Sequence, residues 1–147
     1  MARTTTLKAL AAIAVAAAVP LLSASPAMAA TSNGCTVTPL TPSFAGFNSS
    51  GVKLVNYRIS VNCQPNRTVA IDQQRWEEDS WPNPDDHLGN SSFVRSGVTT
   101  INNVRTLVNG EIGEEEVYQK VRFRVTSNGV TSPWTSLQKS GVLHILD

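Results

Sequence analysis

Two stretches of the chain alternate between hydrophobic and polar residues. From Val55 to Cys63 every second residue is hydrophobic, and from Val117 to Val125 the same alternation is interrupted only by Gln119. A period of two places neighbouring side chains on opposite faces of a β-strand, so each stretch predicts a strand with one buried and one solvated face. Weaker alternation predicts strands at residues 35–37, 68–76, 93–95, 98–107, 130–136 and 142–146.

Turn-forming residues separate these predicted strands. Asn128-Gly129 predicts a type I′ hairpin between strands 117–127 and 130–136, because both central residues of that turn need positive φ. No window after the N-terminal segment shows a convincing helical period. Several short strands divided by turns predict an all-β fold, a single antiparallel β-sandwich.

The first 29 residues have the pattern of a secretory signal peptide. Arg3 and Lys8 precede an apolar run over residues 9–22, and Ala27-Met28-Ala29 is a small-x-small cleavage pattern. The run is shorter than the roughly 20 residues of a membrane-spanning helix. We therefore expect a secreted, extracellular domain at residues 30–147 that does not insert into a membrane, and the Ala-rich leader indicates a bacterial source.

The two cysteines, Cys35 and Cys63, follow the predicted leader. Outside the cell they are expected to form one disulfide, which would fasten the N-terminal strand to a sheet.

The charge balance excludes some classes of partner. The chain has 12 Lys and Arg and 11 Asp and Glu, and removal of Arg3 and Lys8 leaves 10 basic against 11 acidic residues, a net charge of −1. This balance does not favour nucleic acid or acidic lipid. We expect a monomer whose partner is an extracellular protein or a glycan.

Acidic residues are most concentrated between Asp72 and Gly89, where five carboxylates fall within ten residues. A turn at Pro82-Asn83-Pro84 would bring carboxylates together, and a hard cation such as Ca²⁺ binds several oxygens in irregular geometry. Alternatives are a solvated hairpin tip and a pair of catalytic carboxylates. The candidate calcium ligands are Glu77, Asp79, Asp85 and Asp86.

This segment resembles the calcium loop of C2-type β-sandwiches, in which a hydrophobic strand is followed by acids and Asp-Asp-x-Leu-Gly. The resemblance implies a loop at one end of the sandwich that pairs with a second acidic loop. The nearest candidate for that second loop, residues 110–116, offers Glu where the family has Asp. The matching residues are Val69, Ile71, Asp79, Asp85, Asp86, Leu88 and Gly89.

A second segment resembles the last hairpin of fibronectin type III domains. Together the two resemblances imply an immunoglobulin-like or C2-like sandwich. The Trp that the fibronectin family carries on an early strand is absent here, since Tyr57 and Ile59 occupy that strand. The matching residues are Tyr118, Val121, Phe123, Val125, Asn128, Gly129, Ser132, Pro133 and Trp134.

Two further features are candidates for binding. Trp81, between Ser80 and Pro82, is the aromatic residue expected to be exposed, either as an interaction anchor or as a platform for a sugar. Basic residues on the predicted strands would form a stripe that pairs with acids across strands or meets an acidic partner. They are Arg58, Lys120, Arg122 and Arg124.

The sequence carries none of the common motifs of an enzyme. The motifs G-x-S-x-G and H-E-x-x-H and a glycine-rich phosphate loop are missing, and the two histidines, His87 and His144, have no nucleophile at a suggestive spacing. We predict a non-enzymatic binding or accessory protein that binds Ca²⁺ through its acidic loop. Alternative functions are a secreted protease inhibitor and a carbohydrate-active protein that uses two carboxylates.

Overall fold

The computed structural model describes residues 28–79, 82–107 and 114–146, and the regular structure in them consists of β-strands that pair antiparallel. The prediction of an all-β, sandwich-like antiparallel fold is confirmed. No helix in this part of the chain is long and apolar enough to cross a membrane.

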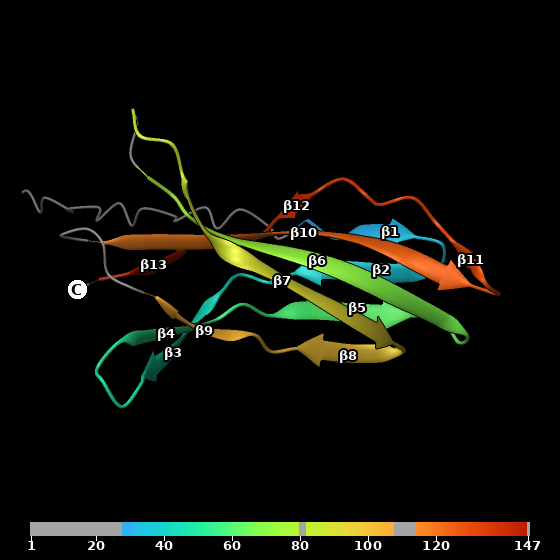
Figure 1. The fold of residues 1–147 in the computed structure, drawn as a ribbon, viewed down its shortest axis with the longest axis horizontal. Coiled ribbons are helices and arrows are strands. Elements are labelled where there is room, and N and C mark those ends of the chain that lie inside the picture. Colours follow the sequence, from blue (N-terminus) through green and yellow to red (C-terminus); the bar gives the residue numbers. More distant parts are fainter. Residues whose placement is uncertain (1–27, 80–81, 108–113, 147) are drawn as a thin grey trace, which may run out of the picture.

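The strands form three sheets (Figure 1). The four-stranded sheet has the order β1 (Ala30–Ser32), β2 (Cys35–Pro39), β5 (Ile59–Cys63), β8 (Val98–Ile101). The long sheet has the order β11 (Val130–Thr131), β10 (Glu115–Ser127), β6 (Arg67–Glu77), β7 (Asp86–Ser96), and β12 (Gln138–Lys139) and β13 (Leu143–Ile145) also pair with β10. The small sheet has the order β3 (Ser43–Phe47), β4 (Lys53–Asn56), β9 (Val104–Leu107).

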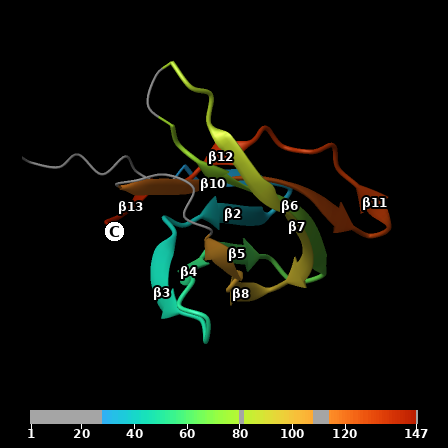
Figure 2. The same cartoon turned by 60° about the vertical axis from the view of Figure 1, so that its left-hand side comes forward.

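The long sheet covers both of the other sheets, because β6 and β10 run most of the length of the molecule (Figures 1 and 2). Its alternate residues Ile71, Val121 and Phe123 pack with Val61 and other residues of the four-stranded sheet in one apolar core. A second, smaller core forms at its other end against the small sheet, from Val55, Tyr57, Leu107, Val117 and Ile145.

Two predicted strands are each broken in the structure. Residues 55–63 divide between β4 and β5, and residues 98–107 divide between β8 and β9, so the predictions of continuous strands were wrong. At the break the Asn56 side chain donates to Asn102 Oδ1 and accepts from the Asn103 N–H, both at 3.1 Å. These side-chain hydrogen bonds redirect both strands together from one sheet to another, while the alternation continues unchanged across the break.

The predicted hairpin at Asn128-Gly129 is confirmed. The φ angles are 50° and 78°, and Ser127 pairs with Val130 across the turn. A second turn of this kind, Asn33-Gly34 with φ of 44° and 74°, joins β1 to β2 and was not predicted.

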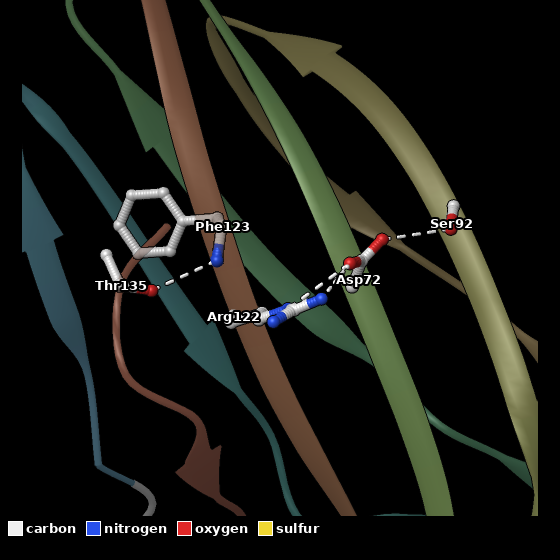
Figure 3. A network of polar contacts seen from close by, with 5 residues as sticks. All are labelled: Asp72, Ser92, Arg122, Phe123 and Thr135. Carbon is white, nitrogen blue, oxygen red and sulfur yellow. Dashed lines mark hydrogen bonds and ion pairs between the residues drawn. The ribbon is translucent and has the colours of Figure 1, made fainter. Parts of the chain in front are cut away.

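Beyond Thr131 the chain leaves the regular ladder but stays beside β10. Hydroxyl oxygens accept hydrogen bonds from β10 amides where strand carbonyls would otherwise do so. Thr135 Oγ1 accepts from the Phe123 N–H at 3.0 Å (Figure 3), and Ser132 and Ser140 accept from Val125 and Gln119 at the same distance. The predicted strand 130–136 is therefore short: Ser132 and Thr135 still donate backbone hydrogen bonds to Val125 and Phe123, but their hydroxyls take the place of strand carbonyls as acceptors.

The predicted disulfide is also confirmed. Cys35 at the start of β2 lies opposite Cys63 at the end of β5, and the two are bonded. Both cysteines are buried in the larger core, so the bond fastens the N-terminal hairpin to the four-stranded sheet.

Candidate functional site: the outer face of the long sheet

The outer face is the side of β6, β7 and β10 turned away from the other two sheets. Alternation along the strands puts Ile71, Gln73 and Phe123 into the interior, so their neighbours face outward. Register then aligns these outward residues in rows across the three strands. They are Ala70, Asp72, Gln74 and Trp76 on β6, His87, Asn90, Ser92 and Val94 on β7, and Lys120, Arg122 and Arg124 on β10.

An ion pair crosses the middle of the outer face. Arg122 Nη2 lies 3.1 Å from Asp72 Oδ2, and the Ser92 hydroxyl donates to Asp72 Oδ1 at 3.0 Å (Figure 3). Both carboxylate oxygens of Asp72 are therefore occupied by neighbours from the two adjacent strands.

A polar hollow of about 270 Å³ lies on one side of this ion pair. Side chains beside it are held by their own hydrogen bonds: the Trp76 indole donates to Gln74 Oε1 at 3.3 Å, and His87 Nε2 bonds Asn90 Oδ1 at 2.8 Å. We call this space the first hollow; its lining is Asp72, Gln73, Gln74, Asn90, Ser91, Ser92 and Arg122.

A second hollow, of about 250 Å³, lies on the other side of the ion pair and combines apolar residues with a cation. Trp134 contributes to its wall, and the guanidinium carbons of Arg122 and Arg124 each lie 4.8 Å from the Trp134 ring centroid. Asp72 and Ser92 line both hollows and so connect them. The complete lining is Ala70, Ile71, Asp72, Ser92, Phe93, Val94, Arg124 and Trp134.

Aromatic residues also gather at the end of the outer face nearest the acidic loop. Lys120 Nζ lies 4.5 Å from the Trp76 ring centroid, and Trp76 contacts His87 with ring centroids 4.9 Å apart. The buried Tyr118 donates its phenol proton to Asp85 Oδ2 at 2.5 Å. Burial raises the pKa of Tyr118 well above its usual range, and the hydrogen bond to Asp85 raises it further.

The structure gives Asp85 and Glu78 of the predicted calcium loop different partners and brings two of the predicted ligands, Glu77 and Asp86, opposite each other. Asp85 accepts from Tyr118, Glu78 pairs with Lys139 at 2.8 Å, and Glu77 lies opposite Asp86 where β6 and β7 meet the loop. The described parts of this loop, 78–79 and 82–85, extend away from the sheets (Figures 1 and 2).

In the described residues, the one group of three His or acidic side chains with ligand atoms within 4.8 Å of each other is elsewhere, at Glu114, Glu116 and His144. His144 Nδ1 lies 3.3 Å from Glu114 Oε1 and 3.8 Å from Glu116 Oε1. Calcium binding by Glu77, Asp79, Asp85 and Asp86 stays a prediction. Trp81, the predicted binding residue, and residues 110–113 of the second acidic loop lie outside the described residues.

The basic stripe forms in part. Lys120, Arg122 and Arg124 share the outer face. Arg58 lies on the opposite side of the long sheet, between β4 and β5, where its main-chain carbonyl accepts from the side chain of the buried Gln119. Sequence reasoning missed Asp72 and Trp134 as members of a site. The polar residues that alternate with the core positions of 68–76 could have indicated Asp72, whereas Trp134 joins the site only through the fold.

Comparison of the chain with protein-family models and with curated proteins gives no match.

Proposed function

We propose that the protein is an extracellular, non-enzymatic binding protein that holds a polysaccharide across the outer face. The observation that carries the proposal is the pair of hollows, which Asp72 and Ser92 connect over the middle of the sheet. The disulfide and the leader pattern support an extracellular location, since disulfides persist in oxidising compartments.

The size of the hollows favours a chain of linked units. Pockets that enclose a drug-sized ligand measure about 300–1,000 Å³, whereas these hollows measure about 270 and 250 Å³. Each has space for one small ring, and a ligand that fills both must extend past the Arg122–Asp72 ion pair. Linked sugar rings meet this requirement.

The chemistry of the lining favours sugar hydroxyls. A hydroxyl both donates and accepts hydrogen bonds, and the first hollow offers amides, hydroxyls, a carboxylate and a guanidinium. In the second hollow the indole of Trp134 and the side chains of Ala70 and Val94 supply apolar surface for the C–H face of a ring.

The same surface is less suited to binding a peptide. Peptides commonly bind a sheet by adding a strand to a free edge. The hollows lie over β6, whose main chain is already paired with β7 on one side and β10 on the other. Recognition must therefore come from side chains alone.

Binding to a panel of neutral and acidic polysaccharides, measured by affinity electrophoresis and pull-down, tests the proposal. We expect retention by at least one polymer and at least ten-fold weaker binding for Trp134→Ala, since the ring is part of the second hollow. Phe47→Ala, which removes an exposed aromatic ring from β3, is the matched control and should bind as the wild type does. The proposal fails if no polymer is retained, or if Trp134→Ala binds unchanged.

The other expectations are tested with the same samples. Trp81→Ala in the panel shows whether the acidic loop takes part. Inhibition of a subtilisin-like or trypsin-like protease at micromolar protein would favour the inhibitor function instead. Calcium bound only by the folded protein at 100 times its dissociation constant would add about 2.7 kcal/mol to stability, so a melting temperature that several millimolar Ca²⁺ leaves unmoved contradicts the calcium prediction.

A further inference from the structure

We infer that the polysaccharide is acidic and that Arg124 binds one of its carboxylates in the second hollow. The inference rests on the proposed function and names the chemical class of its ligand.

Among the described residues, Arg124 is a cation with no anionic partner. Its guanidinium lies over Trp134, and it makes no hydrogen bond or ion pair with any residue in the described ranges. Arg122, two residues away on the same face, is by contrast bonded to Asp72 through Nε and Nη2. Within the described residues the N–H donors of Arg124 therefore have no acceptor, while two of the nitrogens of Arg122 donate to Asp72.

The contact with Trp134 prepares Arg124 for a ligand. A guanidinium over an aromatic ring keeps the N–H groups in its own plane available, and their fork matches the two oxygens of a carboxylate. Since the contact with Trp134 already restricts the long side chain, less rotamer freedom is lost when a ligand binds.

The surroundings of Arg124 also favour an anion supplied by the ligand. Among the lining residues of the second hollow, Asp72 carries the one carboxylate, and Arg122 and Ser92 already occupy both of its oxygens. Ala70 and Val94 add apolar surface, which lowers the local dielectric and strengthens a charge pair. In the first hollow the Arg122 charge is balanced by Asp72, so that hollow suits an uncharged unit.

The test uses three uronate polymers, polygalacturonate, alginate and hyaluronate, and the methyl-esterified form of each, which keeps the chain but removes its charge. Isothermal titration should show that an acidic form binds at least ten-fold more tightly than its ester, and that raising NaCl from 0.05 to 0.5 M weakens the acidic form alone. Arg124→Gln should abolish this preference. Arg105→Gln makes the same charge change on β9 of the small sheet, where the side chain is exposed, and should leave the preference intact.

The outcomes separate the inference from the proposed function. If neutral polymers or esters bind as tightly as the acids and Trp134→Ala weakens both, the inference is overturned and the proposed function stands. If no polymer of any kind binds, both the proposed function and the inference are rejected. Three further results would each overturn the inference. Equal binding of polyglutamate would mean that the ligand is an acidic peptide, and binding of dextran sulfate alone would mean that the anion is a sulfate. Unchanged binding of the acidic polymers by Arg124→Gln would mean that Arg124 is not part of the site.

Discussion

The two faces of the long sheet hold polar side chains in place by different means. On the inner face Gln73 and Gln119 are 1% and 0% exposed, and Gln73 Nε2 donates to Gln119 Oε1 at 2.5 Å. On the outer face Asp72 and Arg122 also contact directly, but their side chains are 33% and 43% exposed. A buried amide must keep its partners because water cannot replace them, whereas an exposed ion pair exchanges with water at little cost.

The inner amides connect the long sheet to the rest of the molecule. Gln119 Nε2 donates to the carbonyls of Leu40 and Arg58, each at 2.7 Å, and Gln73 Oε1 accepts from Asn103 Nδ2 at 2.6 Å. These hydrogen bonds lie where the paired strands pass from one sheet to another. The inner face therefore connects the sheets to one another, and the outer-face residues take no part in these contacts.

The largest effect is expected from the apolar part of the inner face. Phe123→Ala should lower the free energy of unfolding by about 3–5 kcal/mol, since the ring is fully buried in the larger core. Urea unfolding followed by tryptophan fluorescence measures the loss. Arg124→Ala, one residue along on the outer face, is the control and should change stability by less than about 1 kcal/mol; comparable losses would contradict the division between the faces.

Replacing a buried polar residue of the inner face should have the next largest effect on stability. Gln119→Leu keeps the volume but leaves the Leu40 carbonyl without its donor, and should cost about 2–3 kcal/mol, near the upper range for one orphaned buried group. Gln74→Leu makes the same chemical change on the outer face of the neighbouring strand. If both variants unfold at the same urea concentration, burial is not what distinguishes the two faces.

The two buried tyrosines determine how the stability of the protein should depend on pH in the alkaline range. Burial raises the pKa of both Tyr57 and Tyr118 above the ordinary value of 10.0. The folded protein then retains phenol protons that the unfolded chain releases, so stability is complete below pH 10 and falls as pH rises above it. The slope approaches about 1.4 kcal/mol per pH unit for each tyrosine.

Tyr118→Phe should remove about half of this alkaline loss, because the chain has two tyrosines. Unfolding free energies between pH 8 and 11 measure the slope, and absorbance at 295 nm should show phenolate only as the protein unfolds. Phenolate that appears near pH 10 in the folded protein would contradict the assignment.

Local pattern was enough to predict much of the fold. Alternation identified the strands around Val61 and Phe123, and the Asn128-Gly129 turn followed from its need for positive φ. The disulfide followed from two cysteines that come after a predicted leader. The break at Asn56 could not be predicted in this way, since it depends on hydrogen bonds to Asn102 and Asn103, which become neighbours only when the strands pair.

The candidate site shows the same limit more strongly. The acids around Asp85 attracted attention because they are close in sequence, yet Asp85 is bound by Tyr118 from another strand. The hollows combine residues of β6, β7 and β10 with Trp134, and their proximity follows from strand order and register. Single positions such as Arg124 were visible as charges, but that Arg124 has no anionic partner within the described parts of the chain could be seen only in three dimensions.

The smallest expected effect is the most direct comparison of the two faces. A double-mutant cycle on Asp72→Asn and Arg122→Gln should give a coupling of about 0.2–1 kcal/mol, the range of exposed ion pairs, and it should decrease with added salt. The corresponding cycle on Gln73→Ala and Gln119→Ala should give a larger coupling that salt leaves unchanged, because both amides are buried. An outer coupling equal to the inner one would mean that the Arg122–Asp72 pair helps to hold the fold together. Loss of polysaccharide binding in Asp72→Asn would then report damage to the sheet, and only a weak, salt-sensitive coupling allows the outer residues to be read as a binding surface.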